Sequence, residues 1–194
     1  KAVEALPETT VASSFQLYQE LGLRGEVNFP AFEQALKGFS RYASGQDRLL
    51  VLIDYTKPST EKRFYILDLL QKKLLLSTYV AHGRGSGDNY AVAFSNRPGS
   101  YQSSLGFFRT GDTYMGKNGY SLFLDGLEKG INDKARERAI VVHGANYADP
   151  AVLKGQQRLG RSLGCPALPP DISKQVIDTI KGGVLLYIYG LNKA

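Results

Sequence analysis

The feature that most constrains the fold is the pattern of apolar residues from Leu49 onward. These residues come in short runs, and turn-forming stretches such as Lys57-Pro58-Ser59 separate the runs. Short apolar runs bounded by Pro, Gly, Asn and Ser are typical of β-strands. The sequence therefore predicts a mainly β core. Strands are expected over residues 49–55, 63–70, 73–81, 121–127, 138–143 and 184–189.

The residues before this core follow a helical pattern instead. Val11, Phe15 and Tyr18 would share one face of a helix, and Phe32 and Phe39 belong to a second set with the same periodicity. We expect two amphipathic helices that pack as a hairpin on something larger. A third helix is expected after Pro170, where apolar residues again recur at helical spacing.

Length and composition favour a single catalytic or binding unit. A chain of 194 residues with 43% apolar content can bury one substantial core. The expected fold is α+β, with a β-sandwich or barrel core, the N-terminal helical pair and a helix after the cysteine. We divide it into a helical extension packed on the core, residues 1–46, and the core itself, residues 47–194.

Charge and hydropathy narrow the possible partners. The net charge of +6 gives a mild preference for anionic partners, such as a cell-wall polymer. The basic residues at 134–138 alternate with other types, and a solvated face explains them. Nucleic-acid binding would need a basic stripe and a recognisable module, and neither is found. No apolar run reaches the roughly 18 residues of a membrane span, and no signal peptide is recognisable.

Two residues carry the candidate chemistry. Cys165 lies between Gly164 and Pro166, and His143 follows an apolar run and precedes Gly144. A thiol is a good nucleophile only as thiolate, and a nearby imidazole can take its proton. A backbone carbonyl at Gly144 could hold the Nδ1 proton and leave Nε2 as the acceptor. The alternatives are an inert buried cysteine and a histidine with a purely structural role.

The surroundings of Cys165 suggest how a site could be completed. The N–H groups of Gly164 and Cys165 could face a developing oxyanion, whereas Pro166 offers no donor. Arg161 and Ser162 could bind a carboxylate or position a peptide, or they could simply be polar loop residues. The long connection over residues 145–163, with a short helical turn expected at 150–154, joins the two candidate catalytic residues and so favours function.

A second loop region lies upstream. Residues 82–119 are dense in glycine and are expected to form loops, which is where binding sites are often built. The stretch from His82 to Gly87 resembles a phosphate loop but lacks the Gly-Lys-Ser/Thr ending, so we expect a substrate-side loop, with plain turn chemistry as the alternative. Two histidines and one cysteine in distant segments make a poor metal site. No metal and no cofactor are expected.

These residues resemble a known family. His143-Gly144 followed by Ser162-Leu163-Gly164-Cys165 resembles the signature of the L,D-transpeptidase (YkuD-like) catalytic domain, and longer strings resemble its murein L,D-transpeptidase branch. The resemblance covers roughly residues 49–190. The strings are Phe94-Ser95-Asn96, Ser103-Ser104-Leu105-Gly106, Gly116-Lys117-Asn118-Gly119-Tyr120-Ser121, Leu124-Asp125-Gly126-Leu127 and Gly160-Arg161-Ser162-Leu163-Gly164-Cys165-Pro166.

The resemblance implies roles for individual residues. Cys165 matches the nucleophile and His143 the general base, while the backbone of Gly144 orients that base and Gly164 flanks the thiol. One family histidine, two positions before the cysteine, is Leu163 here, and His82 is the hypothetical substitute. The residues expected on the substrate side are Arg161, Ser162, His82, Ser95 and Asn96.

The resemblance also implies an activity. The Cys165 thiolate would attack a peptidoglycan stem tetrapeptide, expel the terminal D-alanine, and pass the acyl group to an amine to form a cross-link. Water as acceptor would make the protein an L,D-carboxypeptidase, and a non-catalytic peptidoglycan-binding module is the other alternative. A redox role is disfavoured because no resolving cysteine is present. The expected location is exported, periplasmic or in the cell envelope, and a carbapenem could form a covalent adduct.

Overall fold

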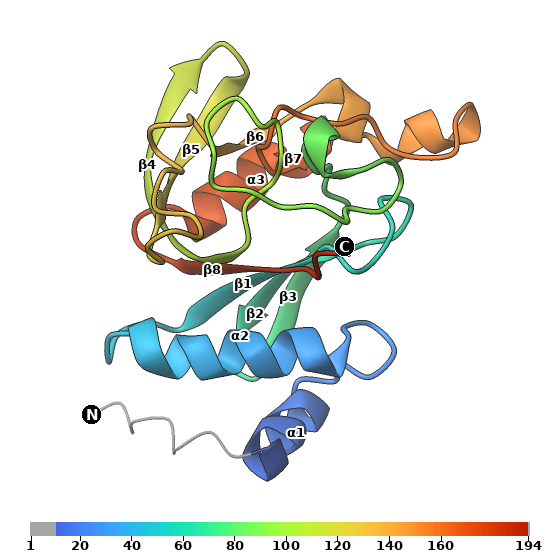
Figure 1. Ribbon diagram of the computed structural model, residues 1–194. Coiled ribbons are helices and arrows are strands. Elements are labelled where there is room, and N and C mark those ends of the chain that lie inside the picture. Colours follow the sequence, from blue (N-terminus) through green and yellow to red (C-terminus); the bar gives the residue numbers. More distant parts are fainter. Residues whose placement is uncertain (1–10, 194) are drawn as a thin grey trace.

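The helical pattern at the start of the chain forms α1 (Val11–Glu20) and α2 (Phe29–Tyr42) in the computed structural model, which describes residues 11–193 (Figure 1). Pro30 stands in the first turn of α2, where a missing N–H costs nothing. Gly22 follows α1 with a φ of 66°, a conformation that glycine adopts without strain. Proline at the start of α2 and glycine after the end of α1 are therefore both residues that suit a helix boundary.

The core is one eight-stranded mixed sheet in the order β3-β2-β1-β8-β4-β5-β6-β7. Its β1–β8 and β6–β7 pairs are parallel and its other pairs antiparallel. The strands are β1 (Leu49–Asp54), β2 (Phe64–Asp68), β3 (Lys73–Thr78), β4 (Gly106–Gly116), β5 (Gly119–Gly126), β6 (Val141–Gly144), β7 (Ala167–Leu168) and β8 (Leu185–Tyr189).

The sheet nearly closes on itself. The chain just after β3 forms an isolated bridge from Ala81 to Ala167 in β7, and a second bridge joins Gly83 to Ser162. These bridges bring the two ends of the strand order together. A nearly closed, barrel-like sheet with helices against it confirms the predicted α+β fold.

Two apolar layers hold the sheet, one on each face. Along β1, Val51 and Ile53 face an inner core shared with α3 (Pro170–Ile180), whereas Leu50 and Leu52 face α2. Figure 1 shows this arrangement, with α3 within the curve of β4–β6 and α2 across β1 and β8. Since successive side chains in a strand point to opposite faces, β1 is buried on both sides and reads as a continuous apolar run.

The expectation that residues 82–119 form only loops is wrong for β4, which occupies Gly106–Gly116. Glycines and threonines interrupt its apolar pattern, so the pattern did not predict a strand. Pairing with β5 and β8 provides the hydrogen bonds that its backbone groups need. The Asn118-Gly119 pair, at the turn from β4 into β5, is a hairpin signal that could have identified it. The strand predicted from residue 138 begins at Val141. The short helical turn expected at 150–154 is confirmed as a 3₁₀ turn, Pro150–Lys154.

Candidate active site

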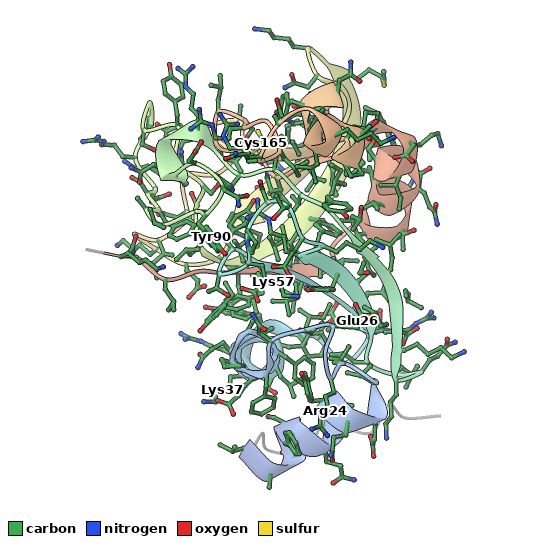
Figure 2. The ribbon with its side chains drawn as sticks, turned by 90° about the vertical axis from the view of Figure 1, so that its right-hand side faces the viewer. Arg24, Glu26, Lys37, Lys57, Tyr90 and Cys165 are labelled. Atoms are coloured by element: carbon green, nitrogen blue, oxygen red, sulfur yellow. The ribbon has the colours of Figure 1, made fainter. Side chains whose placement is uncertain are left out.

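The parallel pairing of β6 with β7 brings the cysteine to the histidine strand. His143 lies opposite Ala167, so Cys165, two residues earlier, lies beside Val141. The Val141 N–H donates to Sγ of Cys165 at 3.4 Å, and Sγ donates to the carbonyl of Ala139 at 3.4 Å. Figure 2 places Cys165 in the part of the molecule away from Lys37 of α2. Two residues distant in the chain thus share one edge of the sheet.

The ring of His143 is buried and oriented by its own backbone. Nδ1 lies 2.9 Å from the carbonyl oxygen of Gly144. Because a carbonyl can only accept, Nδ1 carries the proton and Nε2 keeps its lone pair in the neutral ring. Burial lowers the pKa of His143, and the Gly144 hydrogen bond opposes this only in part. The ring is therefore neutral at neutral pH, and its Nε2 carries no proton.

Cys165 is only 8% exposed, and this burial raises the pKa of its thiol. The Val141 N–H and the positive charge of Arg138 act in the opposite direction with smaller effect. Within residues 11–193, no hydrogen bond joins Sγ to the His143 ring. Both groups are therefore neutral at rest, and a nucleophilic attack by this thiol would require loss of its proton during the attack.

The turn that presents Cys165 is built by Ser162 and Gly164. Ser162 Oγ donates to the Cys165 carbonyl at 2.6 Å and accepts from the Gly164 N–H at 3.1 Å. Gly164 has a φ of 126°, and a Cβ there would lie 2.9 Å from Ile140 Cδ1. The expected oxyanion role of the Gly164 N–H is thus corrected, because Ser162 already occupies that donor. The N–H of Cys165 has no such partner among the residues described.

His82 is buried beneath the neighbouring loop, with 1% exposure. Its Nδ1 accepts from Arg63 Nη2 at 2.8 Å, and its Nε2 lies 3.3 Å from the Gly87 carbonyl. Because arginine can only donate, Nδ1 is unprotonated and Nε2 carries the proton. Burial, and then the Arg63 charge, lower the pKa of His82 to about 3. Both nitrogens are occupied, so in this structure the ring holds its loop in place and does not face a substrate.

The other residues expected on the substrate side lie in two places. Arg161 is part-exposed and donates to the Gly87 carbonyl at 3.2 Å. Ser95 and Asn96 line a surface pocket of about 490 Å³, in which Asn96 donates to Asp133 at 2.7 Å. Arg161 therefore belongs to the loop that precedes Cys165, whereas Ser95 and Asn96 line a separate surface pocket.

Sequence reasoning missed Arg138, which it assigned to a solvated face. The side chain is half-buried, and its Nη1 donates to the Ser95 carbonyl at 2.8 Å. Two tyrosines near the thiol, Tyr55 and Tyr147, were also missed. Burial raises the pKa of each to about 12, and the nearby thiol adds to the effect. No local pattern distinguishes these three residues, because only the tertiary contacts bury them.

Acid should destabilise the fold through His82. The folded pKa of about 3 lies below the ordinary 6.5, so the unfolded chain binds the extra proton first. The stabilisation is complete above pH 6.5 and falls as pH decreases toward 3, by roughly 4 kcal/mol near pH 3.5. Urea unfolding at pH 7 and pH 4 measures this difference. His82→Gln, which cannot titrate, should show a smaller pH dependence, and an equal dependence would contradict the assignment.

Within the part of the chain that the structure describes, no group of three or more His, Cys, Asp or Glu side chains is placed to hold a metal ion. Over the same residues, no helix has the length and apolar character needed to cross a membrane.

Comparison with known proteins gives a family match over most of the chain. A family described as "L,D-transpeptidase catalytic domain" matches residues 23–189. No curated protein sequence matches the chain.

Among solved structures, one similar fold is an L,D-transpeptidase from Mycobacterium smegmatis (13% identity, 74% of this chain and 59% of that one, TM-score 0.44). Another is the helical cell shape determining protein Pgp2 from Campylobacter jejuni (17%, 76% and 50%, TM-score 0.49). A third is an L,D-transpeptidase (Yku) from Stackebrandtia nassauensis (13%, 93% and 78%, TM-score 0.44). The chain spans less than two thirds of the length of the first two.

Proposed function

Because the chain belongs to the L,D-transpeptidase catalytic domain family, we propose that it cross-links peptidoglycan stem peptides through an acyl-enzyme on Cys165. The observation that carries this proposal is the β6–β7 register, which sets the thiol beside the strand that contains His143. The Nδ1 bond to Gly144 leaves Nε2 as the acceptor, and this is the nitrogen that a general base needs.

The proposed reaction has two halves. Sγ of Cys165 bonds to the carbonyl carbon at the L-centre of the stem diamino acid, while His143 Nε2 takes the thiol proton. The bond to the terminal D-alanine breaks, and the imidazolium returns the proton to its amine. An amine from a second stem then attacks the thioester, an amide forms, and the thiol is regenerated.

The resting geometry indicates what substrate binding has to change. Sγ donates to the Ala139 carbonyl, and its proton is therefore not shared with the imidazole. We propose that substrate binding turns the thiol about its Cα–Cβ bond toward Nε2, as apo active sites often tighten on binding. The Cys165 N–H is the proposed oxyanion donor, since Ser162 holds the N–H of Gly164.

The groove that receives the stem peptide is proposed to run past the cysteine loop. Arg161, part-exposed beside the Gly87 carbonyl, is the proposed contact for a stem carboxylate. Leu163 takes the place of the family histidine and is 58% exposed, so it presents an apolar side chain to solvent two residues before the cysteine. The pocket at Ser95 and Asn96 is a more distant candidate subsite.

Two further expectations are kept as proposals. A helical extension over residues 1–46 is proposed for a catalytic domain that spans residues 47–194. Residues 1–10 of it lie outside the described residues, and the packing of Phe32 and Phe39 against the sheet supports the rest. The proposed substrate lies outside the cytoplasmic membrane, so an exported, periplasmic or cell-envelope location is proposed with it.

The product spectrum on isolated disaccharide-tetrapeptides tests the proposal. Mass spectrometry should show cross-linked dimer together with one released D-alanine per bond formed. Tripeptide without dimer would replace the transpeptidase assignment with an L,D-carboxypeptidase. Saturable binding with neither product would overturn the enzymatic proposal in favour of a peptidoglycan-binding module.

A further inference from the structure

The guanidinium of Arg138 is held by neutral groups. Its Nη1 donates to the Ser95 carbonyl at 2.8 Å and to Ser104 Oγ at 2.7 Å. Its Nη2 donates to Ser100 Oγ at 3.2 Å and to the Gln102 carbonyl at 2.8 Å. Among the described residues, no carboxylate forms an ion pair with it. The charge is thus half-buried and uncompensated, which is an unusual state for an arginine.

This charge lies against the loop that presents the nucleophile. A Cβ built on Gly164 would be 3.4 Å from Arg138 Nη2 and 3.0 Å from the Gln102 carbonyl that the same nitrogen binds. The residue after Arg138, Ala139, supplies the carbonyl that accepts from Sγ. Ala139 also has a φ of 54°, a conformation that costs a non-glycine residue energy. The charge of Arg138 and the strained backbone of Ala139 are therefore both adjacent to the loop and thiol of Cys165.

Two tyrosines and one histidine near the thiol carry no charge at neutral pH. Tyr55 and Tyr147 each have a pKa of about 12 and are therefore protonated. Burial lowers the pKa of His143, on the neighbouring strand, and keeps its ring neutral. Arg138 is therefore the cation that acts on Cys165 within the described residues, and the interaction favours the thiolate.

We propose that Arg138 is a positioning residue for the reaction. Its charge stabilises the Cys165 thiolate as the proton leaves, and its four hydrogen bonds hold residues 95–104 against the nucleophile loop. The proposal rests on the proposed function for the role of Cys165 as nucleophile. It explains how a buried thiol can ionise during attack although the resting pair is neutral.

The test measures the thiol directly, through the rate of alkylation by iodoacetamide between pH 6 and 10. Arg138→Met removes the charge and keeps an unbranched side chain. Its rate profile should shift to higher pH by about one unit, which makes alkylation about tenfold slower at pH 7.5. Arg138→Lys keeps the charge but cannot make all four hydrogen bonds, and its profile should stay near that of the wild type.

Arg136→Met is the matched control. Arg136 is two residues away on the same segment, is half-exposed, and pairs with Asp125 at 2.6 Å. Its removal should leave the alkylation profile unchanged. Thermal melts of all four proteins report whether each is folded under assay conditions.

Two results would overturn the proposal. One is a folded Arg138→Met protein with the wild-type profile. The other, which applies even if Arg138→Met does not fold, is an Arg138→Lys profile shifted by a full unit, because the charge would then not be the cause. Alkylation needs no peptidoglycan, so a shift in Arg138→Met alongside a wild type that makes no cross-links would refute the proposed function and support the Arg138 inference.

Discussion

Replacing Cys165 with alanine is expected to abolish release of D-alanine and formation of cross-links, by a factor on the order of 10⁶. The proposed acyl-enzyme forms on Sγ, and the described residues around it offer no second thiol, because the chain contains a single cysteine. Quantification of free D-alanine from disaccharide-tetrapeptides measures the loss. The same variant should take up no carbapenem, whereas the wild type should gain the mass of one adduct.

Cys165→Ser is the matched variant for this experiment. It keeps a side chain that can donate to the Ala139 carbonyl, but a hydroxyl ionises far less readily than a thiol. Its melting temperature should therefore stay close to that of the wild type while its activity is lost. If either variant released D-alanine at the wild-type rate, the acyl-enzyme would have to form on a residue other than Cys165.

Replacing His143 with glutamine is expected to slow acylation by about 10²- to 10⁴-fold at neutral pH, the usual contribution of a general base. Burial lowers the pKa of His143 and raises that of Cys165, so the wild type does not rely on a thiolate formed beforehand. The acid limb of kcat/KM should consequently lie below pH 6.5, where the ring becomes protonated and can no longer accept. Stopped-flow measurement of carbapenem acylation against pH records this limb.

The variant should change the shape of that profile as well as its height. Without the base, acylation by His143→Gln should rise with pH until the thiol ionises by itself, and the acid limb of the wild type should be gone. His82→Gln serves as the control, because His82 is the chain's other histidine and its pKa of about 3 lies far from this limb. An unchanged limb in His143→Gln would remove His143 from the mechanism.

Most of the elements could be predicted from local patterns. The paired helices and the strands β1, β2, β3, β5 and β8 carry continuous or periodic apolar residues, and burial on one or both faces requires such patterns. β4 escaped prediction because Gly106, Gly111 and Gly116 interrupt its apolar residues, and only pairing with β5 and β8 makes it a strand. Propensity is a weak guide where neighbouring strands decide the conformation.

For the candidate site, too, some features could be predicted from the sequence and others could not. Cys165, His143 and the flanking glycines could be selected from the sequence because their reactivity belongs to the residue types themselves. The burial of His82 beside Arg63, and the occupation of the Gly164 N–H by Ser162, could not be foreseen. Arg63 and His82 are 19 residues apart and meet only in the folded chain. Ser162 and Gly164 are two residues apart, but their hydrogen bond depends on the conformation of the turn, which the sequence pattern does not specify.

The sequence alone was sufficient to select the candidate nucleophile and base and to predict the type of most elements, because these follow from side-chain chemistry and short-range periodicity. Only the tertiary structure decided the protonation states and the surroundings of the thiol. The register of β6 against β7 places Cys165 beside Val141, and the fold half-buries Arg138 with no carboxylate partner among the described residues. Desolvation and charge proximity arise from contacts between distant segments, and a pKa is set by those contacts.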